Sequence, residues 1–391
     1  MTITLIGCGC GSLTEEAAAA IREADLLIGS SRLLDRHGMG KRCVAAVTAE
    51  AIAAAVKQEQ ASRPCVLFSG DSGFYSGARL LLPLLEGQNV RVLPGVSSLQ
   101  TLAARLGESW QDWRLCSAHG VDCDAVAEVC RGKPAFFLTG GRQSPDALCR
   151  EFCEAGLGFL NVSVGENLGT AEENLFCGSA AEAAQCQFAP LSVLLAEAAP
   201  GAPTRSPGWP DGFFLRVEGV PMTKQEIRAA ALAKLGVGPE DTCWDIGTGT
   251  GSVGIELAML CRRVYGVERS KAALAAAEEN RRRHGAWKLR LVEGEAPEVL
   301  ADLPAPDAVF VGGSGGRMEE ILHAVHDANP QARICVSAVT LEGLHNSIAA
   351  LRALGYRTEV TQLSVSRGRE VGESTMMLAL NSVYLIAGYA Q

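Results

Sequence analysis

Residues 244–256 read WDIGTGTGSVGIE, and they indicate how the second half of the chain folds. The apolar run that ends in it predicts a strand, and the run that follows its glycines predicts a helix. Gly247, Gly249 and Gly251 let the backbone turn sharply and approach a ligand, while the N–H groups of the helix point outward. The stretch therefore predicts a strand–loop–helix unit whose loop holds a small molecule.

Carboxylates at strand ends distinguish two kinds of ligand for this loop. Glu268 ends the next strand, where it would accept hydrogen bonds from both hydroxyls of an adenosine ribose. Gly249, Gly251 and Gly254 also satisfy the G-x-G-x-x-G spacing of a nicotinamide dinucleotide site. Asp245 favours S-adenosylmethionine instead, because an acid there suits an ammonium and a sulfonium but repels a pyrophosphate. A glycine turn without any ligand is the third interpretation.

Strands and helices alternate around this loop. Helices are predicted over 270–285 and 340–355, each with a capping residue in front and a glycine behind. Such alternation predicts a doubly wound, mainly parallel sheet. Residues 357–366 and 375–386 are both strand-like, and the loop RGREVGES between them is too short for a crossover helix. We therefore expect these two strands to pair antiparallel, which would end the sheet in a hairpin.

Two further loops of the second half follow predicted strands. Glu295 and Ala296 lie at the depth where an adenine would lie. The fourth strand ends in VGGSGG, whose small residues include no base, so this loop suits a bulky substrate with an activated carbon nucleophile. The N–H groups of Gly313, Ser314 and Gly315 could hold a carboxylate of that substrate. An ordinary tight turn explains the same residues equally well.

Glycine-rich turns also follow three strands of the first half: GCGCG (7–11), SGDSGFY (69–75) and PGVSSLQ (94–100). They would converge on one crevice, the usual ligand position in an open α/β sheet. Asp71 could bind an ammonium or ribose group there. His119 could contact a substrate, or it could be a loop histidine with ordinary hydrogen bonds.

The rest of the first half predicts two small α/β lobes joined near residues 107–120. The predicted strands are 3–6, 26–29, 65–69, 90–93, the run RLCSAH, the run AFFLT, 161–165 and 191–197. The predicted helices are 15–25, 49–60, 97–106, one from Asp122, and one opened by Ser144 and Pro145 and closed at Gly156.

Residues 199–211 separate the two halves. The segment reads APGAPTRSPGWPD, and its prolines can sustain neither a helix nor a central strand. We therefore divide the chain into a first domain (1–198), a proline-rich linker (199–219) and a second domain (220–391).

Composition excludes several classes of protein. The net charge of −9 argues against a nucleic-acid partner. No run of about eighteen apolar residues predicts a membrane span, and no basic region precedes the first apolar stretch, so we expect no signal peptide. The 14 cysteines are scattered without a C-x-x-C pair, so we expect them to be reduced and expect no metal site. These features predict a cytoplasmic protein.

The long motifs resemble two known families. GCGCGSLT, SGDSGFYSGARLL and residues 90–120 are similar to the tetrapyrrole methylases, especially the subgroup that methylates carbon 5 in cobalamin synthesis. PMTKQEIRAAAL, WDIGTGTGSVGIE, VYGVERS, EGEAPE, DAVFVGGSGG and SVSRGRE resemble the partner that methylates carbon 15 and removes the carboxyl of the carbon 12 acetate. The resemblance implies a two-lobed tetrapyrrole-methylase fold followed by a Rossmann-like class I methyltransferase sheet. It also implies a bifunctional C-methyltransferase acting on a precorrin, metal-free or cobalt-containing, with one S-adenosylmethionine site in each domain.

The resemblance implies cofactor contacts in both domains but no catalytic side chain, because alignment and exclusion of water suffice for this reaction. In the second domain, Asp245 and Glu295 add to the contacts that the resemblance implies. The full set of predicted cofactor contacts there is Thr223, Asp245, Gly247, Thr248, Gly249, Thr250, Gly251, Glu268, Glu295 and Ala296. Those of the first domain are Gly9, Gly11, Asp71, Pro94, Gly95, Ser97 and Ser98. Cys10 and Ser72 stand where the family usually has proline, which would loosen both loops.

A tetrapyrrole carries many carboxylates, which a chain of charge −9 repels at long range. We therefore predict a local basic rim of Arg317, Arg367 and Arg369, the last two in the hairpin loop; solvated loop charges are the alternative. The predicted substrate contacts are this rim, His119, and Gly313 to Gly315. We expect a homo-oligomer. The rival functions are a methylase of another tetrapyrrole position, a nicotinamide-dependent oxidoreductase and a non-catalytic scaffold.

Overall fold

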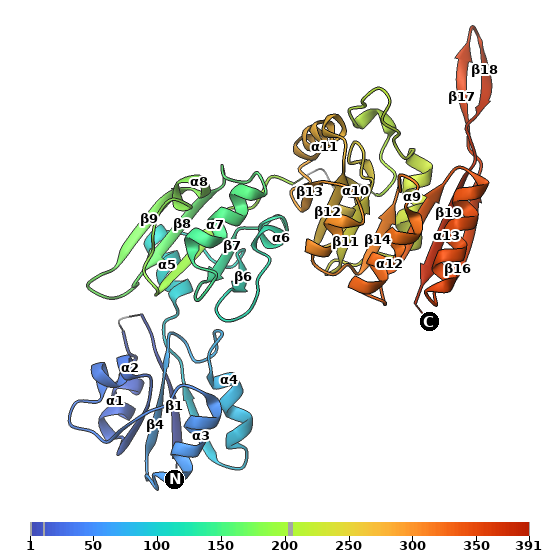
Figure 1. Cartoon of the computed structure of the whole chain (residues 1–391). Coiled ribbons are helices and arrows are strands. Elements are labelled where there is room, and N and C mark those ends of the chain that lie inside the picture. The colour runs from blue at the N-terminus through green and yellow to red at the C-terminus, as the bar shows by residue number, and fades with distance from the viewer. Residues whose placement is uncertain (1, 11, 202–205, 391) are drawn as a thin grey trace. The chain divides into compact units, whose positions relative to one another are not determined.

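A computed structural model describes residues 2–10, 12–201 and 206–390 of the chain. It divides into two compact units (Figure 1). Unit 1 comprises Met1–Val129 and Lys133–Ala198, and unit 2 comprises Cys130–Gly132 and Ala199–Gln391. Among the described residues, none of the helices has the length and apolar character that crossing a bilayer requires.

The first lobe of unit 1 is a parallel five-stranded sheet in the order β3-β2-β4-β1-β5. Its strands are β1 (Thr2–Cys8), β2 (Leu26–Gly29), β3 (Cys43–Ala45), β4 (Pro64–Ser69) and β5 (Asn89–Leu93). Its helical segments are α1 (Glu15–Glu23), α2 (Ser31–His37), α3 (Ala49–Gln58), α4 (Ala78–Leu81), η1 (Leu82–Leu85) and α5 (Ser98–Leu106). The predicted elements are confirmed. The short α2 and β3 were not predicted, because neither is long enough to show a period in the sequence.

The second lobe is a mixed five-stranded sheet in the order β6-β7-β10-β8-β9. Its strands are β6 (Arg114–Ser117), β7 (Ala135–Leu138), β8 (Asn161–Glu166), β9 (Asn174–Ser179) and β10 (Ser192–Ala196), and its helices are α6 (Ala125–Val129), α7 (Pro145–Glu154) and α8 (Ala180–Ala183). The helix expected from Asp122 begins only at Ala125, because the Asp124 side chain accepts the N–H of Ala127 at 2.9 Å and caps it there. The largely exposed β9 was not predicted.

Unit 2 is built on a seven-stranded sheet in the order β13-β12-β11-β14-β15-β19-β16. Its strands are β11 (Thr242–Ile246), β12 (Arg263–Glu268), β13 (Leu289–Glu293), β14 (Ala308–Val311), β15 (Arg333–Ala338), β16 (Arg357–Leu363) and β19 (Val383–Tyr389). Of these, β19 alone runs antiparallel, to both β15 and β16. The carboxyl end of β16 therefore lies at the same edge of the sheet as those of the parallel strands.

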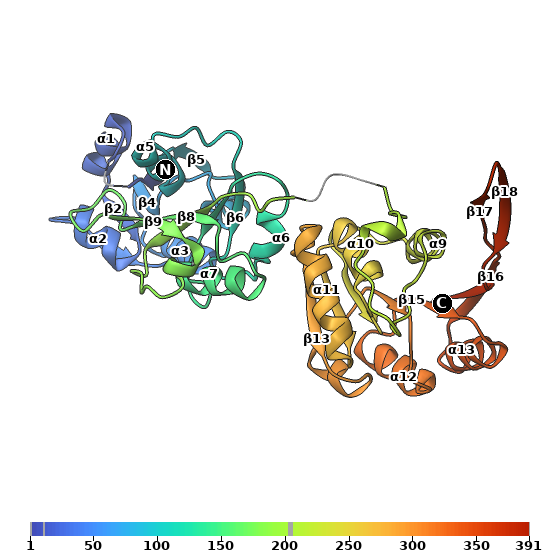
Figure 2. The same cartoon turned by 90° about the horizontal axis from the view of Figure 1, so that it is seen from above.

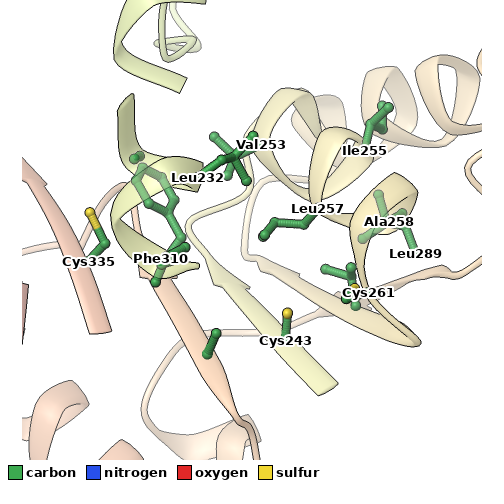
Figure 3. Close-up of a cluster of buried hydrophobic side chains, with 14 of the residues drawn as sticks. Leu232, Cys243, Val253, Ile255, Leu257, Ala258, Cys261, Leu289, Phe310 and Cys335 are labelled. Carbon is green, nitrogen blue, oxygen red and sulfur yellow. The ribbon is translucent and has the colours of Figure 1, made fainter. Parts of the chain in front are cut away.

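Helices cover both faces of this sheet (Figure 2). They are α9 (Gln225–Leu235), α10 (Ser252–Leu260), α11 (Lys271–Arg283), α12 (Met318–Ala328) and α13 (Leu341–Ala353), with short η2 (Asp211–Phe213) and η3 (Glu298–Asp302). One apolar cluster joins α9 and α10 to side chains such as Cys243 and Phe310 (Figure 3). The other joins α12 and α13 to Trp244 and Val309. Neighbouring strand residues thus face opposite clusters, which confirms the doubly wound sheet.

The C-terminal strands differ from the prediction in one respect. The strand expected at 375–386 is two strands: β18 (Ser374–Ala379) pairs with β17 (Ser366–Val371), and β19 pairs with β16. The segment expected as a loop is thus mostly the β17–β18 ribbon, which stands away from the sheet in Figure 1. The turn at Gly372 has φ 62°, and the Oγ atoms of Ser364 and Ser382 lie 2.9 Å apart at the base of the ribbon.

Part of the predicted linker packs on unit 2. Trp209 and Phe214 are buried in the cluster with α9 and α10. The N–H groups of Gly208 and Trp209 donate to the carboxylate of Glu256, at 2.6 and 3.0 Å. Pro203, one of the prolines that define the linker, lies outside the described residues.

Candidate functional sites

The loop between β11 and α10 turns at three glycines. Gly247, Gly249 and Gly251 have φ values of 72°, 57° and 83°, where a side chain would be strained. A Cβ atom on Gly247 would lie 2.9 Å from both the N and the O of Gly313. This glycine loop therefore touches the loop after β14, and the contact leaves no space for a side chain.

Asp245, at the end of β11, is a buried carboxylate with one unpaired oxygen. The Thr248 hydroxyl donates to its Oδ2, whereas Oδ1 and the buried Thr250 hydroxyl have no hydrogen-bond partner among the described residues. Burial raises the pKa of Asp245 to about 6, although hydrogen bonds from Thr248 and Gly254 act in the opposite direction. Because unpaired buried polar atoms are costly, both atoms point to a polar or cationic ligand. The ammonium and hydroxyl groups of S-adenosylmethionine fit them.

Glu268 and Thr223 lie beside the same loop. The carboxylate of Glu268 accepts the N–H groups of Gly249 at 3.1 Å and of Ser270 at 2.8 Å. A Cβ atom on Gly249 would lie 3.3 Å from the carbonyl oxygen of Pro221, two residues before Thr223. The structure thus brings together the glycine loop, both carboxylates and the segment that contains Thr223.

Sequence reasoning missed Arg269, an exposed cation at this edge. Its Nη1 donates to Oε1 of Glu295 at 3.0 Å and lies 3.5 Å from where a Cβ atom on Gly315 would be. Arg269 thus joins the loop after β13 to the loop after β14. Its place directly after Glu268 was the available signal. Ala296 is buried in the apolar cluster with α12 and α13.

Two of the three predicted rim arginines already have carboxylate partners. Arg317 pairs with Glu298 at 2.6 Å and Glu320 at 2.5 Å, and these hydrogen bonds raise the pKa of Arg317. Arg367 pairs with Asp211 at 2.9 Å and Glu226 at 2.5 Å.

Arg369 differs from the other two rim residues. It is exposed on β17, and no carboxylate of the described residues forms an ion pair with it. Arg367 therefore holds the base of the ribbon to α9, whereas Arg369 is open to solvent.

Arg228 is a second residue that sequence reasoning missed. It is wholly buried, and its guanidinium donates to Glu256 at 2.8 Å, to Asp211 at 3.1 Å, and to the carbonyls of Thr223 and Trp209. Burial alone would raise the pKa of Asp211, but hydrogen bonds from Arg367 and Arg228 outweigh it and lower that pKa. This cluster fixes the segment that carries Thr223.

The three glycine-rich loops of unit 1 meet at the carboxyl ends of β1, β4 and β5. A Cβ atom on Gly95 would lie 2.4 Å from the carbonyl oxygens of both Gly7 and Gly70. A Cβ atom on Gly9 would lie 2.5 Å from the N of Val96. Only glycines permit this approach of three backbones. Gly11 lies outside the described residues.

The polar residues predicted in these loops have partners within the protein. Asp71 accepts the N–H groups of Gly73 at 2.8 Å and Gly95 at 3.0 Å. Ser97 caps α5 by accepting the N–H of Gln100 at 3.2 Å, and Pro94 and Ser98 flank the same turn. Their contacts with a cofactor therefore stay predictions.

A cleft of ≈ 640 Å³ lies beside the first loop and α5, lined by Cys10, Val96, Thr101, Arg105 and Glu173 among others. Its volume is within the range of small-molecule sites, about 300–1,000 Å³. His119 is not among the lining residues. It is exposed after β6, with Nδ1 3.3 Å from the carbonyl oxygen of Thr139.

A hollow of ≈ 480 Å³ in unit 2 is lined by Arg352, Tyr356 and Arg357, among others. Arg357 begins β16, so the hollow lies at the amino edge of the sheet, opposite the glycine loop. We assign it no part in the cofactor site.

Comparisons with family models match both halves of the chain. Residues 2–184 match the tetrapyrrole (corrin/porphyrin) methylases, and residues 215–387 match a precorrin methyltransferase domain. Both resemblances predicted from the motifs are confirmed.

Comparisons with individual proteins agree. A Sinorhizobium protein named precorrin-6Y C(5,15)-methyltransferase [decarboxylating] is 31% identical over 87% of this chain and 85% of its own. A Pyrobaculum calidifontis protein named "Probable cobalt-precorrin-6B C(15)-methyltransferase (decarboxylating)" is 44% identical over 48% of this chain and 98% of its own. A crystal structure of a precorrin-6y C5,15-methyltransferase from Geobacter metallireducens is 38% identical, with a TM-score of 0.45, covering 47% of this chain and 96% of its own.

Proposed function

Because the chain belongs to the family of precorrin-6Y C(5,15)-methyltransferases (decarboxylating), we propose that it methylates carbons 5 and 15 of a precorrin ring in cobalamin biosynthesis. It also removes the carboxyl group of the carbon 12 acetate, which converts precorrin-6B to precorrin-8X. In this proposal residues 1–198 methylate carbon 5, residues 199–219 are a linker, and residues 220–391 methylate carbon 15 and decarboxylate.

S-adenosylmethionine is the proposed cofactor, with one site in each unit. The observation that carries the proposal for unit 2 is the unpaired Oδ1 of buried Asp245, next to the glycine loop. When bound, the cofactor supplies an electrophilic methyl group on a sulfonium. Asp245 would neutralise its positive charge, Glu268 would accept the ribose hydroxyls, and Glu295 and Ala296 would line the adenine.

The chain's own residues need only align the ring carbon and exclude water. The substrate carbon is already nucleophilic through the conjugation of the ring, so no general base is required. The N–H groups of Gly313 to Gly315 would hold a substrate carboxylate beside the glycine loop, which Gly313 contacts. The conjugated ring then accepts the electron pair that the departing carbon dioxide leaves, and a proton from solvent converts the remaining CH2 group to a methyl group on carbon 12.

Cations at this edge would bind the remaining carboxylates. We propose that Arg369 and Arg269 contact the substrate directly, because both are exposed. Arg317 and Arg367 stay in the proposed rim, although Arg367 also fastens the ribbon. Replacing Arg369 or Arg269 by alanine is expected to weaken substrate binding and to spare cofactor binding. Unchanged substrate affinity in both variants would remove these residues from the rim.

We also propose a cytoplasmic homo-oligomer without a nucleic-acid partner. The acidic charge supports the last point. In support of association, Val371, Met376 and Met377 are exposed on the β17–β18 ribbon, whose two outer edges pair with no other strand in the described part of the chain. In sedimentation experiments the wild type should be larger than a monomer, and Met376→Ser with Met377→Ser should dissociate it. A monomeric wild type would contradict this proposal.

The function is tested by calorimetry and by mass spectrometry of the product. We expect two S-adenosylmethionine sites per chain and no binding of a nicotinamide dinucleotide. With a metal-free or a cobalt-containing precorrin, the product should gain two methyl groups and lose one carbon dioxide. Dinucleotide binding, or an unchanged substrate with both rings, would overturn the proposal.

A further inference from the structure

Asp211 is a buried carboxylate that joins three parts of unit 2. It lies in η2, within the segment that the sequence predicts as a linker, and 5% of its surface is exposed. Its Oδ1 accepts the N–H of Gln225 at 2.9 Å and a hydrogen bond from Nη1 of Arg228 at 3.1 Å. Its Oδ2 accepts a hydrogen bond from Nη1 of Arg367 at 2.9 Å. Methyl transfer as proposed gives this carboxylate no role.

The bond to Gln225 caps the first turn of α9. The N–H groups of that turn need acceptors from outside the helix. Lys224, the residue before α9, makes no capping hydrogen bond with its side chain in the described part of the chain. Asp211 supplies the acceptor from fourteen residues earlier, and its negative charge suits the amino end of a helix. The start of α9 is therefore fixed by Asp211.

The bond to Arg228 carries this effect to Thr223. The guanidinium of Arg228 is wholly buried and donates to the carbonyl oxygen of Thr223. At the other end of the same short segment, the carbonyl oxygen of Pro221 lies 3.3 Å from where a Cβ atom on Gly249 would be. Residues 221–225 thus run from the glycine loop to the start of α9, and Asp211 holds their carboxyl end.

Asp211 is itself held on a rigid part of the fold. Trp209 and Phe214 flank it in sequence, are buried in the cluster with α9 and α10, and stack with ring centroids 6.3 Å apart. The N–H groups of Gly208 and Trp209 donate to Glu256 of α10. The carboxylate therefore has a fixed position from which it can hold another segment.

We propose that Asp211 is a positioning residue for the cofactor of unit 2. It fixes residues 221–225 before the cofactor binds, so that Thr223 contacts S-adenosylmethionine at the glycine loop without first having to be ordered. It acts through Arg228 and the start of α9. This inference rests on the proposed function, which places S-adenosylmethionine in unit 2.

Glu226 provides a matched control. It also pairs with Arg367, accepting hydrogen bonds from Nη2 at 2.5 Å and from Nε at 3.2 Å. In the described part of the chain, however, it forms no hydrogen bond with Arg228 or Thr223. Glu226→Gln therefore weakens the attachment of the β17–β18 ribbon, as a change at Asp211 does, but leaves the hold on residues 221–225 intact.

The first experiment measures the release of carbon dioxide, which the proposed function assigns to unit 2, at saturating precorrin and varied S-adenosylmethionine. Asp211→Asn keeps the shape of the side chain but removes its charge. The KM for S-adenosylmethionine should rise about tenfold, which corresponds to the loss of one charge-assisted hydrogen bond. The kcat should stay within about twofold of the wild type, because the reacting groups are unchanged. Glu226→Gln should keep the wild-type KM.

The second experiment is hydrogen exchange of the full chain and requires no methyl transfer. Without cofactor, amide hydrogens of residues 223–228 should exchange faster in Asp211→Asn than in the wild type or in Glu226→Gln. In the wild type, bound S-adenosylmethionine should slow exchange in the same residues, a measurement that does not depend on the folding of any variant. Thermal melting checks that both variants fold.

Four results would remove Asp211 from this role. They are a wild-type KM in Asp211→Asn, equal increases of the KM in both variants, wild-type exchange of residues 223–228 in Asp211→Asn, and no slowing of that exchange in a wild type that calorimetry shows to have bound S-adenosylmethionine. An equal increase in both variants would assign the effect to the ribbon instead. Since the exchange of the cofactor-free chain involves no reaction, failure of this inference is distinguishable from failure of the proposed function.

Discussion

Asp245 is the single residue whose chemistry depends most clearly on pH. Its pKa in the folded protein is about 6, above the ordinary value of 3.8, because burial disfavours the charged form. The stability that this shift gives the cofactor-free protein is fully present below pH 3.8 and is lost as the pH rises through about 6. A cationic ligand reverses this preference for the neutral carboxyl group, since it binds the ionised carboxylate.

The first prediction concerns Asp245→Asn. Above pH 6 the wild type must bury a charge that the variant lacks, so the cofactor-free variant should be more stable there by about 3 kcal/mol. The difference should shrink toward pH 4. Urea unfolding of both proteins at pH 4, 5.5 and 7.5 measures it. An equal difference at all three pH values would mean that Asp245 does not titrate in this range.

The second prediction concerns cofactor affinity. Calorimetry should show wild-type affinity at unit 2 falling as the pH drops below about 6, by up to about tenfold per pH unit. Asp245→Asn should bind weakly and without this dependence. Thr250→Val, which removes the second unpaired buried polar group that the described residues place beside this glycine loop, should bind more weakly but keep the wild-type pH profile. A flat wild-type profile would contradict a carboxylate contact.

The third prediction concerns Arg228. Arg228→Ala leaves the buried carboxylate of Glu256 without an ion-pair partner and leaves Asp211 with Arg367 alone, which should cost unit 2 about 3–5 kcal/mol. Arg283→Ala removes an arginine that is 47% exposed and 3.8 Å from Glu279, and should leave stability nearly unchanged. Denaturant unfolding compares the two. Equal losses would mean that the buried cluster does not fix the segment before α9.

Some residues of the candidate site could be predicted from the sequence, and others could not. Asp245 and Glu268 were predictable because each ends a strand, and strand ends in a parallel sheet share one edge. Arg228 was not, since Asp211, Glu256 and Arg367 are far apart along the chain and follow no period. Only the packed fold brings their charges together.

At the scale of elements, the β17–β18 ribbon is where the prediction failed. All its residues except Arg367 are exposed, so the sequence shows no alternation of buried and exposed positions that would mark a strand. The strands of the central sheet were predictable because burial imposes apolar runs on them. A two-stranded ribbon is at best marginally stable by itself, so we expect the ion pairs of Arg367 to stabilise it.

The fourth prediction tests this attachment. Arg367→Gln removes the ion pairs with Asp211 and Glu226, so amide hydrogens of residues 366–379 should exchange faster, while those of the central sheet should not. Arg369→Gln, on the same strand but exposed, is the matched control and should exchange like the wild type. Faster exchange in both variants would show that the ribbon does not depend on Arg367.

At the scale of the whole molecule, each unit has its own apolar core and its own glycine loops at strand ends. The sequence predicts a division because the proline-rich segment interrupts both kinds of period. The antiparallel pairing of strands in the second lobe of unit 1 could not be predicted, since short strands give no signal about the direction of their neighbours. Because each unit has its own core and its own loops, we expect a substitution in one unit to abolish the reaction of that unit alone.

The fifth prediction applies this to the products. Gly249→Arg places a large side chain at φ 57° beside Pro221, so carbon 15 methylation and decarboxylation should be lost while carbon 5 is still methylated. Gly95→Ala puts a Cβ atom 2.4 Å from the carbonyl oxygens of Gly7 and Gly70, so it should lose only carbon 5 methylation. Mass spectrometry distinguishes the two products, because only the second has lost carbon dioxide. If both variants lose both methylations, the units do not act independently; if one variant loses both and the other only one, the reactions proceed in a fixed order.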